Sequence, residues 1–239
     1  MRTLAWFSCG AASAVATKLC PEAIPVYCDT GAEHPDNKRF MADCERWFDR
    51  PVTVLKNEKY RDTWHVWEKE RYLDGPSGAH CTGALKMAPR LAFQRADDVH
   101  VIGYTTDPTD VNRANRLRAT YPEMKFRMPL IERGLYKASC LALLQSAGIV
   151  LPAMYLLGFH NNNCIPCVKA QSPGYWALVR KHFPEKFDRL NALSRKLNMG
   201  LVKIDGRRRF LDELPNDWST TEPIAPACDF LCQIAEQDL

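Results

Sequence analysis

Residues 4–31 read LAWFSCGAASAVATKLCPEAIPVYCDTG, and this stretch decides the fold class. The apolar run Leu4–Phe7 predicts a short strand, and the small residues 8–13 predict a tight turn that leads into a helix ending near Leu19. A second apolar run, Ile24–Tyr27, predicts another strand that ends just before an Asp-Thr-Gly sequence. A strand, a helix and a second strand in this order are typical of a parallel α/β sheet.

The alternation continues to about residue 130. We expect two further helices, after Pro35 up to Phe48 and near Thr109–Ala119, and three further strands, Val52–Leu55, Val99–Gly103 and Phe126–Met128. The sequence therefore predicts an α/β fold with a Rossmann-like parallel sheet, helices on both faces and a ligand at the carboxyl ends of the strands. Residues 56–81 interrupt the alternation, and we expect an inserted lid or loop there.

The sequence after Pro129 becomes mainly helical, with expected helices near 137–147, 175–182 and 185–197. We accordingly divide the chain into an adenine nucleotide-binding α/β domain over residues 1–170 and a small helical C-terminal region over residues 171–239. The second region ends in an irregular tail that carries Cys228 and Cys232.

Composition narrows the class of protein. The 239 residues are 46% hydrophobic and 25% charged, as in folded globular proteins. The net charge of +4 lacks the dense basic stripe of a dedicated nucleic-acid binder, so a nucleic-acid partner is not expected, although it is not excluded. No stretch approaches the roughly 20 apolar residues of a membrane helix, and the N-terminus does not resemble a secretory signal. We expect a cytoplasmic protein with no membrane partner.

The turn after the first strand is a candidate anion site. Its backbone N–H groups and the following helix N-terminus suit a phosphate, although a tight turn without a ligand would use the same small residues. The end of the second strand would lie beside it, where Asp29 is suited to accept hydrogen bonds from a ribose. Two such strand ends favour a nucleotide. The candidate nucleotide-binding residues here are Ser8, Cys9, Gly10, Ala11, Ser13, Asp29, Thr30 and Gly31.

Ten cysteines are many for a cytoplasmic chain and indicate metal or redox chemistry. Cys164 and Cys167 form a Cys-x-x-Cys motif, which alone fits zinc, an iron–sulfur cluster, a redox dithiol or chance. Three preceding asparagines and the following Lys169 would suit an anionic thiolate cluster. A second Cys-x-x-Cys or His pair, expected for a structural zinc site, is missing from the sequence.

Several motifs resemble those of phosphoadenosine phosphosulfate (PAPS) reductases, which belong to the adenine nucleotide α-hydrolase group. Residues Phe7–Ser13 and Tyr27–Pro35 look like the modified pyrophosphate loop and the Asp-Thr-Gly strand of that family. Cys81–Pro89 and Asn163–Lys169 look like further family motifs in the expected order. The resemblance implies the α-hydrolase version of the Rossmann-like fold and an adenine nucleotide substrate, either adenylyl sulfate (APS) or PAPS.

The resemblance also implies a [4Fe–4S] cluster. Cluster-bearing relatives carry Cys-Cys-x-x-Arg-Lys-x-x-Pro, of which this chain keeps the first cysteine as Cys81 and the lysine as Lys86, whereas Thr82 replaces the second cysteine. The implied metal ligands are Cys81, Cys164 and Cys167, with Cys228 or Cys232 as the fourth or with one open iron. Cys81 as a small buried residue is the simpler alternative. Lys86 and Arg113 would contact the nucleotide.

A cysteine in the C-terminal tail attacks the substrate sulfur in the reductases that the chain resembles. Here the tail offers Cys228 and Cys232, four residues apart, as catalytic thiols. The implied enzyme is an oxidoreductase that forms an S-sulfonate and releases sulfite with the help of a thioredoxin-like or other thiol reductant. The alternative for this pair is a docked terminal helix whose cysteines pack inward.

Two other functions remain open. One is iron–sulfur-dependent transfer of sulfur to a nucleoside or nucleic acid, with an open iron as the sulfur carrier. Ala12 weakens that hypothesis, because ATP-cleaving relatives carry a magnesium-binding Asp at the matching position. The other is a nucleotide-binding protein without catalytic activity. Arg207, Arg208 and Arg209 offer guanidinium groups to an anion, or they form a solvated loop.

Overall fold

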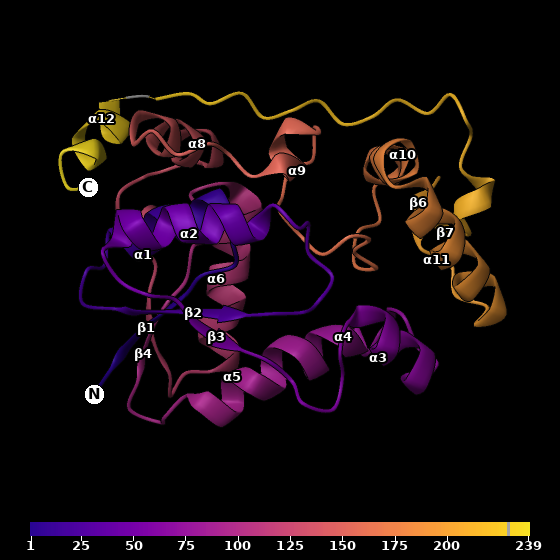
Figure 1. The fold of residues 1–239 in the computed structure, drawn as a ribbon, viewed down its shortest axis with the longest axis horizontal. Helices are drawn as coiled ribbons and strands as arrows, with labels where there is room; N and C mark the ends of the chain where they lie inside the picture. Colours follow the sequence, from indigo (N-terminus) through magenta and orange to yellow (C-terminus); the bar gives the residue numbers. More distant parts are fainter. Residues whose placement is uncertain (229) are drawn as a thin grey trace.

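The computed structural model describes residues 1–228 and 230–239, with every side chain among them except that of Phe230. Figure 1 shows the arrangement of the elements. In chain order they are β1 (Thr3–Trp6), α1 (Ala11–Lys18), β2 (Ile24–Cys28), α2 (Asn37–Phe48), β3 (Thr53–Leu55), α3 (Thr63–Glu70), α4 (His80–Thr82), a π-helix (Gly83–Met87), α5 (Ala88–Phe93), β4 (Val99–Val101), α6 (Pro108–Thr120), β5 (Lys125–Arg127), α7 (Pro129–Glu132), α8 (Lys137–Ser146), α9 (Ala153–Leu156), α10 (Pro173–His182), α11 (Pro184–Lys196), β6 (Val202–Ile204), β7 (Arg207–Arg209), a 3-10 helix (Leu211–Glu213) and α12 (Phe230–Glu236).

A five-stranded parallel sheet forms the centre of the fold, in the order β3-β2-β1-β4-β5. Leu4 of β1 is fully buried and pairs with Ile24 on one side and His100 on the other. The chain therefore leaves β1 in one direction to make β2 and β3 and returns on its other side to make β4 and β5. The predicted α/β class with a Rossmann-like sheet is confirmed. Ligands of such sheets bind where the strand order reverses, at the carboxyl ends of β1 and β4.

Helices lie on both sides of the sheet, as predicted, with α1 and α2 on one side and α5 on the other (Figure 1). Helix α1 is buried from Ala11 to Thr17, because its small side chains let it pack closely between the sheet and α8. Helix α2 instead buries one stripe, in which Phe40, Cys44 and Phe48 follow at intervals of four residues. These helices cover the first hydrophobic core, the buried cluster that includes Phe7, Phe40 and Leu144.

Gly103, just after β4, lets this loop approach the start of α1. A Cβ atom at this position would lie 2.8 Å from both the N and Cα atoms of Ser13. We expect Gly103→Ala to lower the free energy of unfolding by about 1–3 kcal/mol, the usual cost of overpacking. Gly83→Ala is the matched control, because a Cβ there meets nothing within 4 Å. Urea titrations would contradict this account if both variants lost the same stability.

A second hydrophobic core joins segments that are far apart in the sequence. Trp67 of α3, Phe159 and Trp176 of α10 are almost fully buried in it, together with residues of α11 and β6. Of the inserted lid or loop expected over residues 56–81, the loop is wrong for α3, a helix whose aromatic side chains belong to this core. The core draws on residues from both sides of position 170.

The last part of the chain returns to the first core. Beyond Pro215 it crosses the molecule in an extended course, yellow in Figure 1, and ends in α12 beside α8. Cys232 and Ala235 of α12 are buried in that core. None of the helices in the described part of the chain is both long and apolar enough to cross a membrane.

Candidate functional site

The turn between β1 and α1 is held closed by Ser13. Its Oγ accepts a hydrogen bond from the Ser8 N–H (3.0 Å) and donates one to the Gly10 carbonyl (2.9 Å). Cys9 lies between them in the left-handed backbone conformation, with φ 55°, and its side chain is buried in the first core. Burial raises the pKa of the Cys9 thiol, so this residue offers a ligand its backbone alone.

Tyr155 of α9 completes this turn, and sequence reasoning missed it. Its hydroxyl accepts a hydrogen bond from the Ala11 N–H (3.1 Å) and would lie 3.3 Å from a Cβ on Gly10. Ser8 and Ala11 therefore already have protein acceptors for their N–H groups. The N–H groups of Gly10, Ala12 and Ser13 have no hydrogen-bond partner within residues 1–228 and 230–239. An anion bound at the start of α1 would accept hydrogen bonds from these three N–H groups.

The turn after β2 carries Asp29. Its carboxylate forms an ion pair with Lys56 (2.8 Å) and accepts a hydrogen bond from the Gly31 N–H (2.9 Å). Burial alone would raise the pKa of Asp29, but these two hydrogen bonds and the charge of Lys56 together lower it below its usual value. Asp29 is thus an ionised acceptor, as a ribose-binding carboxylate must be.

Thr30 connects the β2 turn directly to the Cys-x-x-Cys loop. Its hydroxyl lies 2.9 Å from the Cys164 sulfur and donates a hydrogen bond to Glu33. The Cys164 thiol also lies 3.6 Å from the Glu33 carboxylate, and the Ile165 N–H donates to the Ala32 carbonyl (2.8 Å). A group bound at the β2 turn would therefore lie beside Cys164. Glu33 stands in the quoted family motif, but sequence reasoning had assigned it no role.

The strand ends and the cysteine motifs open into one cavity of about 680 Å³. Seven of the predicted site residues line it: Ser8, Thr30, Cys81, Lys86, Arg113, Cys164 and Cys167. The other predicted nucleotide-binding residues, Cys9, Gly10, Ala11, Ser13, Asp29 and Gly31, lie in the two turns without lining the cavity. Arg113 is held at the cavity by Asp110 (3.0 Å), and its guanidinium lies 4.7 Å from the centre of the Tyr104 ring.

Lys86 brings a positive charge to the thiol groups. It belongs to the π-helix Gly83–Met87, an uncommon geometry that often marks functional sites. Burial alone would lower the pKa of Lys86, but negative charge on Cys164, Glu33 and Cys167 raises it above its usual value. Burial raises the pKa of the Cys164 thiol to about 12, although the charge of Lys86 opposes this shift. Lys86 is thus the cation that would stabilise an anionic sulfur group here.

Cys167 has a further partner that sequence reasoning missed. Its backbone N–H donates to the hydroxyl of Tyr175 (2.7 Å), and Trp176 donates its indole N–H to the Ala170 carbonyl (2.9 Å). Two aromatic residues of α10 therefore hold the loop that carries both cysteines. Burial also raises the pKa of Cys81, which reaches the cavity from α4.

The three cavity cysteines come from α4 and from one loop. Within the described residues, no three His, Cys, Asp or Glu side chains lie close enough together to hold a single metal ion. In a [4Fe–4S] cluster each thiolate binds a different iron, so the ligands lie farther apart than those of one ion. The three thiols line one cavity, with Lys86 at its wall.

Cys228 and Cys232 do not line this cavity. They form a disulfide bond with each other, and the Cys232 sulfur lies 3.9 Å from the Ser139 carbonyl of α8. Figure 1 shows α12 at the opposite end of the molecule from α4 and α10. The structure thus places Cys232 in a docked terminal helix, buried against α8, and the exposed Cys228 before that helix. Cys228 is not beside the three cavity cysteines, contrary to its expected role as a cluster ligand. Asp229 lies outside the described residues.

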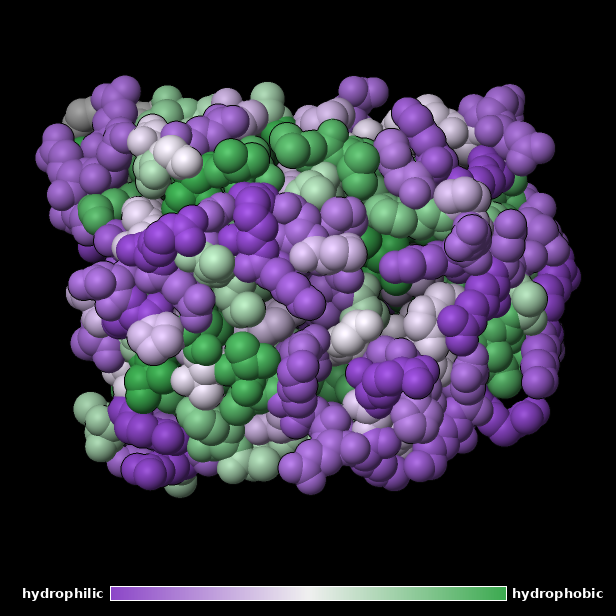
Figure 2. All heavy atoms as spheres, viewed as in Figure 1, coloured by the Kyte–Doolittle hydropathy of each residue, from purple (hydrophilic) through white to green (hydrophobic). Residues whose placement is uncertain are grey.

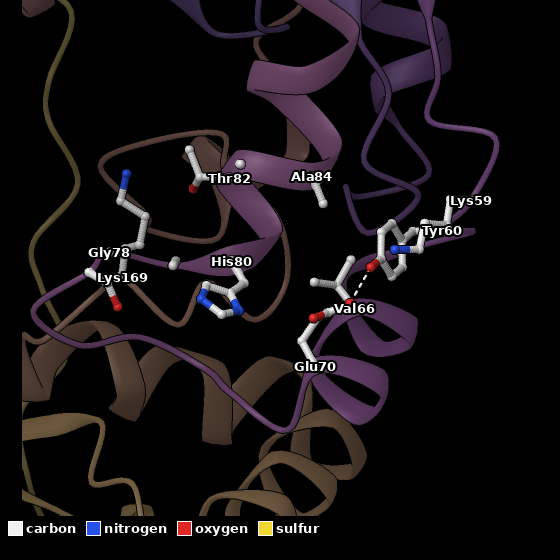
Figure 3. A pocket seen from close by; sticks show the side chains of 12 residues that line it. Lys59, Tyr60, Val66, Glu70, Gly78, His80, Thr82, Ala84 and Lys169 are labelled. Carbon is white, nitrogen blue, oxygen red and sulfur yellow. Dashed lines mark hydrogen bonds between the residues drawn. The ribbon is translucent and has the colours of Figure 1, made fainter.

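A smaller pocket of about 490 Å³ adjoins the cavity, and Thr82 and Lys169 line both. Figure 3 shows these two residues at one end of it, Lys59 and Tyr60 at the other, and His80 between them. The Tyr60 hydroxyl donates a hydrogen bond to Glu70 there. We call the larger cavity, lined by Cys81, Cys164 and Cys167, the thiol cavity. Lys169 therefore lies between the thiol cavity and the smaller pocket, which is lined by both basic and acidic side chains.

Comparisons with known proteins add little to this geometry. No model of a protein family matches the chain, and no curated protein matches it. The solved structures that match include the phosphoadenylyl-sulfate (PAPS) reductase of Candida auris in its phosphate complex. The likeness has 12% sequence identity and a TM-score of 0.48, and it covers 68% of this chain and 79% of that one. Strand order and parallel pairing define the fold independently of it.

Proposed function

We propose that the chain is an enzyme that binds adenylyl sulfate or PAPS at the ends of β1 and β2 and reduces its sulfate group to sulfite. The observation that supports it is one cavity in which Ser8 and Thr30 meet Cys81, Cys164 and Cys167. Lys86 and Arg113 add the positive charges that a sulfonucleotide needs.

The thiol that attacks the sulfur would come from the tail. A thiolate displaces the nucleotide from sulfur: an S–S bond forms, the S–O bond breaks, and AMP or adenosine 3′,5′-bisphosphate leaves. A second thiolate then attacks the cysteine sulfur of the S-sulfonate, so that sulfite leaves and a disulfide remains. Two thiols are oxidised while the sulfate sulfur is reduced. Because Cys228 and Cys232 are disulfide-bonded, a dithiol reductant of the thioredoxin type must open them before each turnover.

Cys81, Cys164 and Cys167 would hold a [4Fe–4S] cluster in this proposal. Bound there, the cluster would act by positioning and electrostatics beside the sulfate without transferring electrons. Residues of the chain itself would orient the cysteines and balance their charge. The Thr30 hydroxyl lies 2.9 Å from the Cys164 sulfur, and Lys86 balances the charge of the thiolates and of the sulfonate group.

Iron content and sulfite release test the two parts separately. Protein purified without oxygen is expected to contain about four irons with matching acid-labile sulfide. Cys81→Ser and Cys164→Ser should lose most of this iron. Cys20→Ala, a buried cysteine away from the cavity, is the matched control and should keep it. With dithiothreitol, the wild-type protein should release sulfite from adenylyl sulfate or PAPS. Iron-free wild-type protein would overturn the cluster, and iron-loaded protein without sulfite release would overturn the reaction.

Transfer of sulfur to a nucleoside is the second candidate. The observation that favours it is the set of three cavity cysteines without the tail pair, which would leave one iron of a cluster open to an added sulfide. Its test is incubation with ATP, sulfide and RNA, followed by mass spectrometry of the digested nucleosides. A thiolated nucleoside without sulfite release would select this reaction.

A further inference from the structure

Positive charge is concentrated in one part of the chain. Residues 160–210 contain eleven Lys and Arg residues against three Asp and Glu residues, although the whole chain has a net charge of only +4. The rest of the chain is therefore acidic on balance. This stretch includes α10, α11 and the β6–β7 hairpin, which lie together in Figure 1. Hydrophilic side chains cover most of the same edge of the molecule in Figure 2.

The β6–β7 hairpin carries the most unusual part of this charge. Its two strands are joined by Asp205 and Gly206, whose φ angles of 49° and 77° are those of a tight hairpin turn. All three residues of β7 are exposed arginines, and Lys203 of β6 stands directly opposite Arg208. Because side chains alternate between the two faces of a strand, Arg207 and Arg209 share the face opposite to that of Lys203 and Arg208.

Only part of this charge is neutralised within the protein. Arg208 forms an ion pair with Asp74 (2.7 Å) on the loop before α4. Lys203, Arg207 and Arg209 form no ion pair with any residue of the described part of the chain. Three cations on one short ribbon are thus available to an external partner.

The ribbon stands at the rim of the thiol cavity. The Lys203 N–H donates to the carbonyl of Gln171 (2.8 Å), and both Gln171 and Lys169 line the cavity. A polyanion that follows the ribbon therefore reaches Lys169 and the cavity mouth.

We propose that the β6–β7 hairpin binds the sugar–phosphate backbone of a single-stranded nucleic acid and leads it to the thiol cavity. Arg207 and Arg209 share one side of β7, with Cα atoms about 6.6 Å apart, a spacing on the order of the phosphate repeat in an extended strand. Guanidinium groups bind phosphate through two parallel hydrogen bonds. A base within a duplex is stacked and would have to flip before it could enter a cavity, so a single strand is the better partner.

An anionic membrane is the competing partner for a basic surface. The tip of the hairpin carries the carboxylate of Asp205, which would be the first group to meet a flat anionic surface. A strand lying along the ribbon avoids this carboxylate. The surface goes beyond the proposed function, because binding does not depend on which sulfur reaction the cavity performs. A nucleic acid bound to this surface would be the acceptor in the sulfur-transfer reaction, the second candidate function.

Fluorescence anisotropy with labelled, mixed-sequence RNA and DNA 20-mers tests this surface on the full chain. We expect the wild-type protein to bind, and R207E/R209E to bind at least tenfold more weakly. The slope of log K against log salt should fall by about 1.4, because each phosphate contact with a single strand contributes about 0.7. Comparing the affinity for RNA with the affinity for DNA shows which of the two nucleic acids the surface prefers. Anisotropy needs no turnover, so failure of either sulfur reaction leaves this readout intact.

Two further variants keep the test decisive. R116E/R118E makes the same charge change at exposed positions of α6 and should bind within twofold of the wild type. R207Q/R209Q removes the charge without reversing it and should weaken binding in the same direction, which covers misfolding of the first variant. Equal loss in the hairpin and α6 variants, no binding by the wild type, or binding only to vesicles containing anionic lipid would overturn the proposal.

Discussion

The free energy of unfolding is expected to fall by about 3 kcal/mol between pH 7 and pH 4 because of His100 alone. His100 lies in β4 and is 1% exposed. Burial lowers its pKa to about 4, and the nearby charge of Arg90 acts in the same direction. A histidine with a lowered pKa takes up its proton in the unfolded chain first. Its contribution is therefore complete above about pH 6.5 and is lost as the pH falls through 4.

A hydrogen bond from Trp6 also disfavours the protonated form of His100. The indole N–H of Trp6 donates to Nδ1 of His100 (3.0 Å), and the two rings stack at 6.0 Å. Protonation of Nδ1 would place two donors against each other in the sheet. Asp98 titrates in a separate range, because the hydrogen bond from Arg2 lowers its pKa to about 2 and its contribution is lost only below about pH 4.

Urea titrations at several pH values between 7 and 4 measure this effect. His100→Gln keeps an acceptor for the Trp6 indole and cannot titrate, so most of the pH dependence in this range should disappear. His65→Gln on α3 is the matched control and should keep the wild-type slope. A wild-type slope retained in His100→Gln would show that other groups cause the acid sensitivity.

Local patterns in the sequence predicted the sheet well, because its first two strands are short apolar runs next to a helix. Leu4–Phe7 and Ile24–Tyr27 each correspond to an observed strand within a residue at either end. The β6–β7 hairpin was not predicted, although Asp205-Gly206 is a strong turn signal. Three arginines obscured it, because a strand on the molecular surface has no apolar run to reveal it.

Contacts between distant residues were beyond sequence reasoning. Tyr155 reaches Ala11 across 144 positions, and Thr30 reaches Cys164 across 134. The second pair brings together two motifs that had each been identified separately, so their residues were predictable and their contact was not. No local pattern marks Tyr155 as a partner of the turn between β1 and α1, because its contact with Ala11 arises only in the folded chain.

The proposed reaction depends most on the tail cysteines. Cys228 is exposed, whereas Cys232 is buried against α8. The preceding segment is anchored at the cavity, where Thr221 lines the wall and the Glu222 carbonyl lies 2.7 Å from His160 Nε2. Cys228 lies six positions after Glu222, an extended reach of about 20 Å. Once the disulfide is reduced, Cys228 is therefore the better candidate to attack a bound sulfonucleotide, while Cys232 remains on α8.

Replacement of each tail cysteine should consequently give different results. Cys228→Ser is expected to lower sulfite release at least a thousandfold, because it removes the attacking thiol, and no S-sulfonate should form. Cys232→Ser should form the S-sulfonate and hold it, because the resolving thiol is missing. Mass spectrometry of the intact chain after one turnover would detect the added sulfonate group. An external thiol in excess should then release sulfite from this variant.

The different results expected for Cys228→Ser and Cys232→Ser distinguish a catalytic pair of cysteines from a disulfide bond with only a structural role. If the bond merely stabilised the tail around the start of α12, both substitutions would lower the midpoint of thermal unfolding alike and neither would trap an S-sulfonate. An S-sulfonate on Cys232 would reverse the two roles. Equal sulfite release by both variants and the wild type would move the attacking thiol into the cavity, where Cys164 already lies beside Thr30 and Glu33.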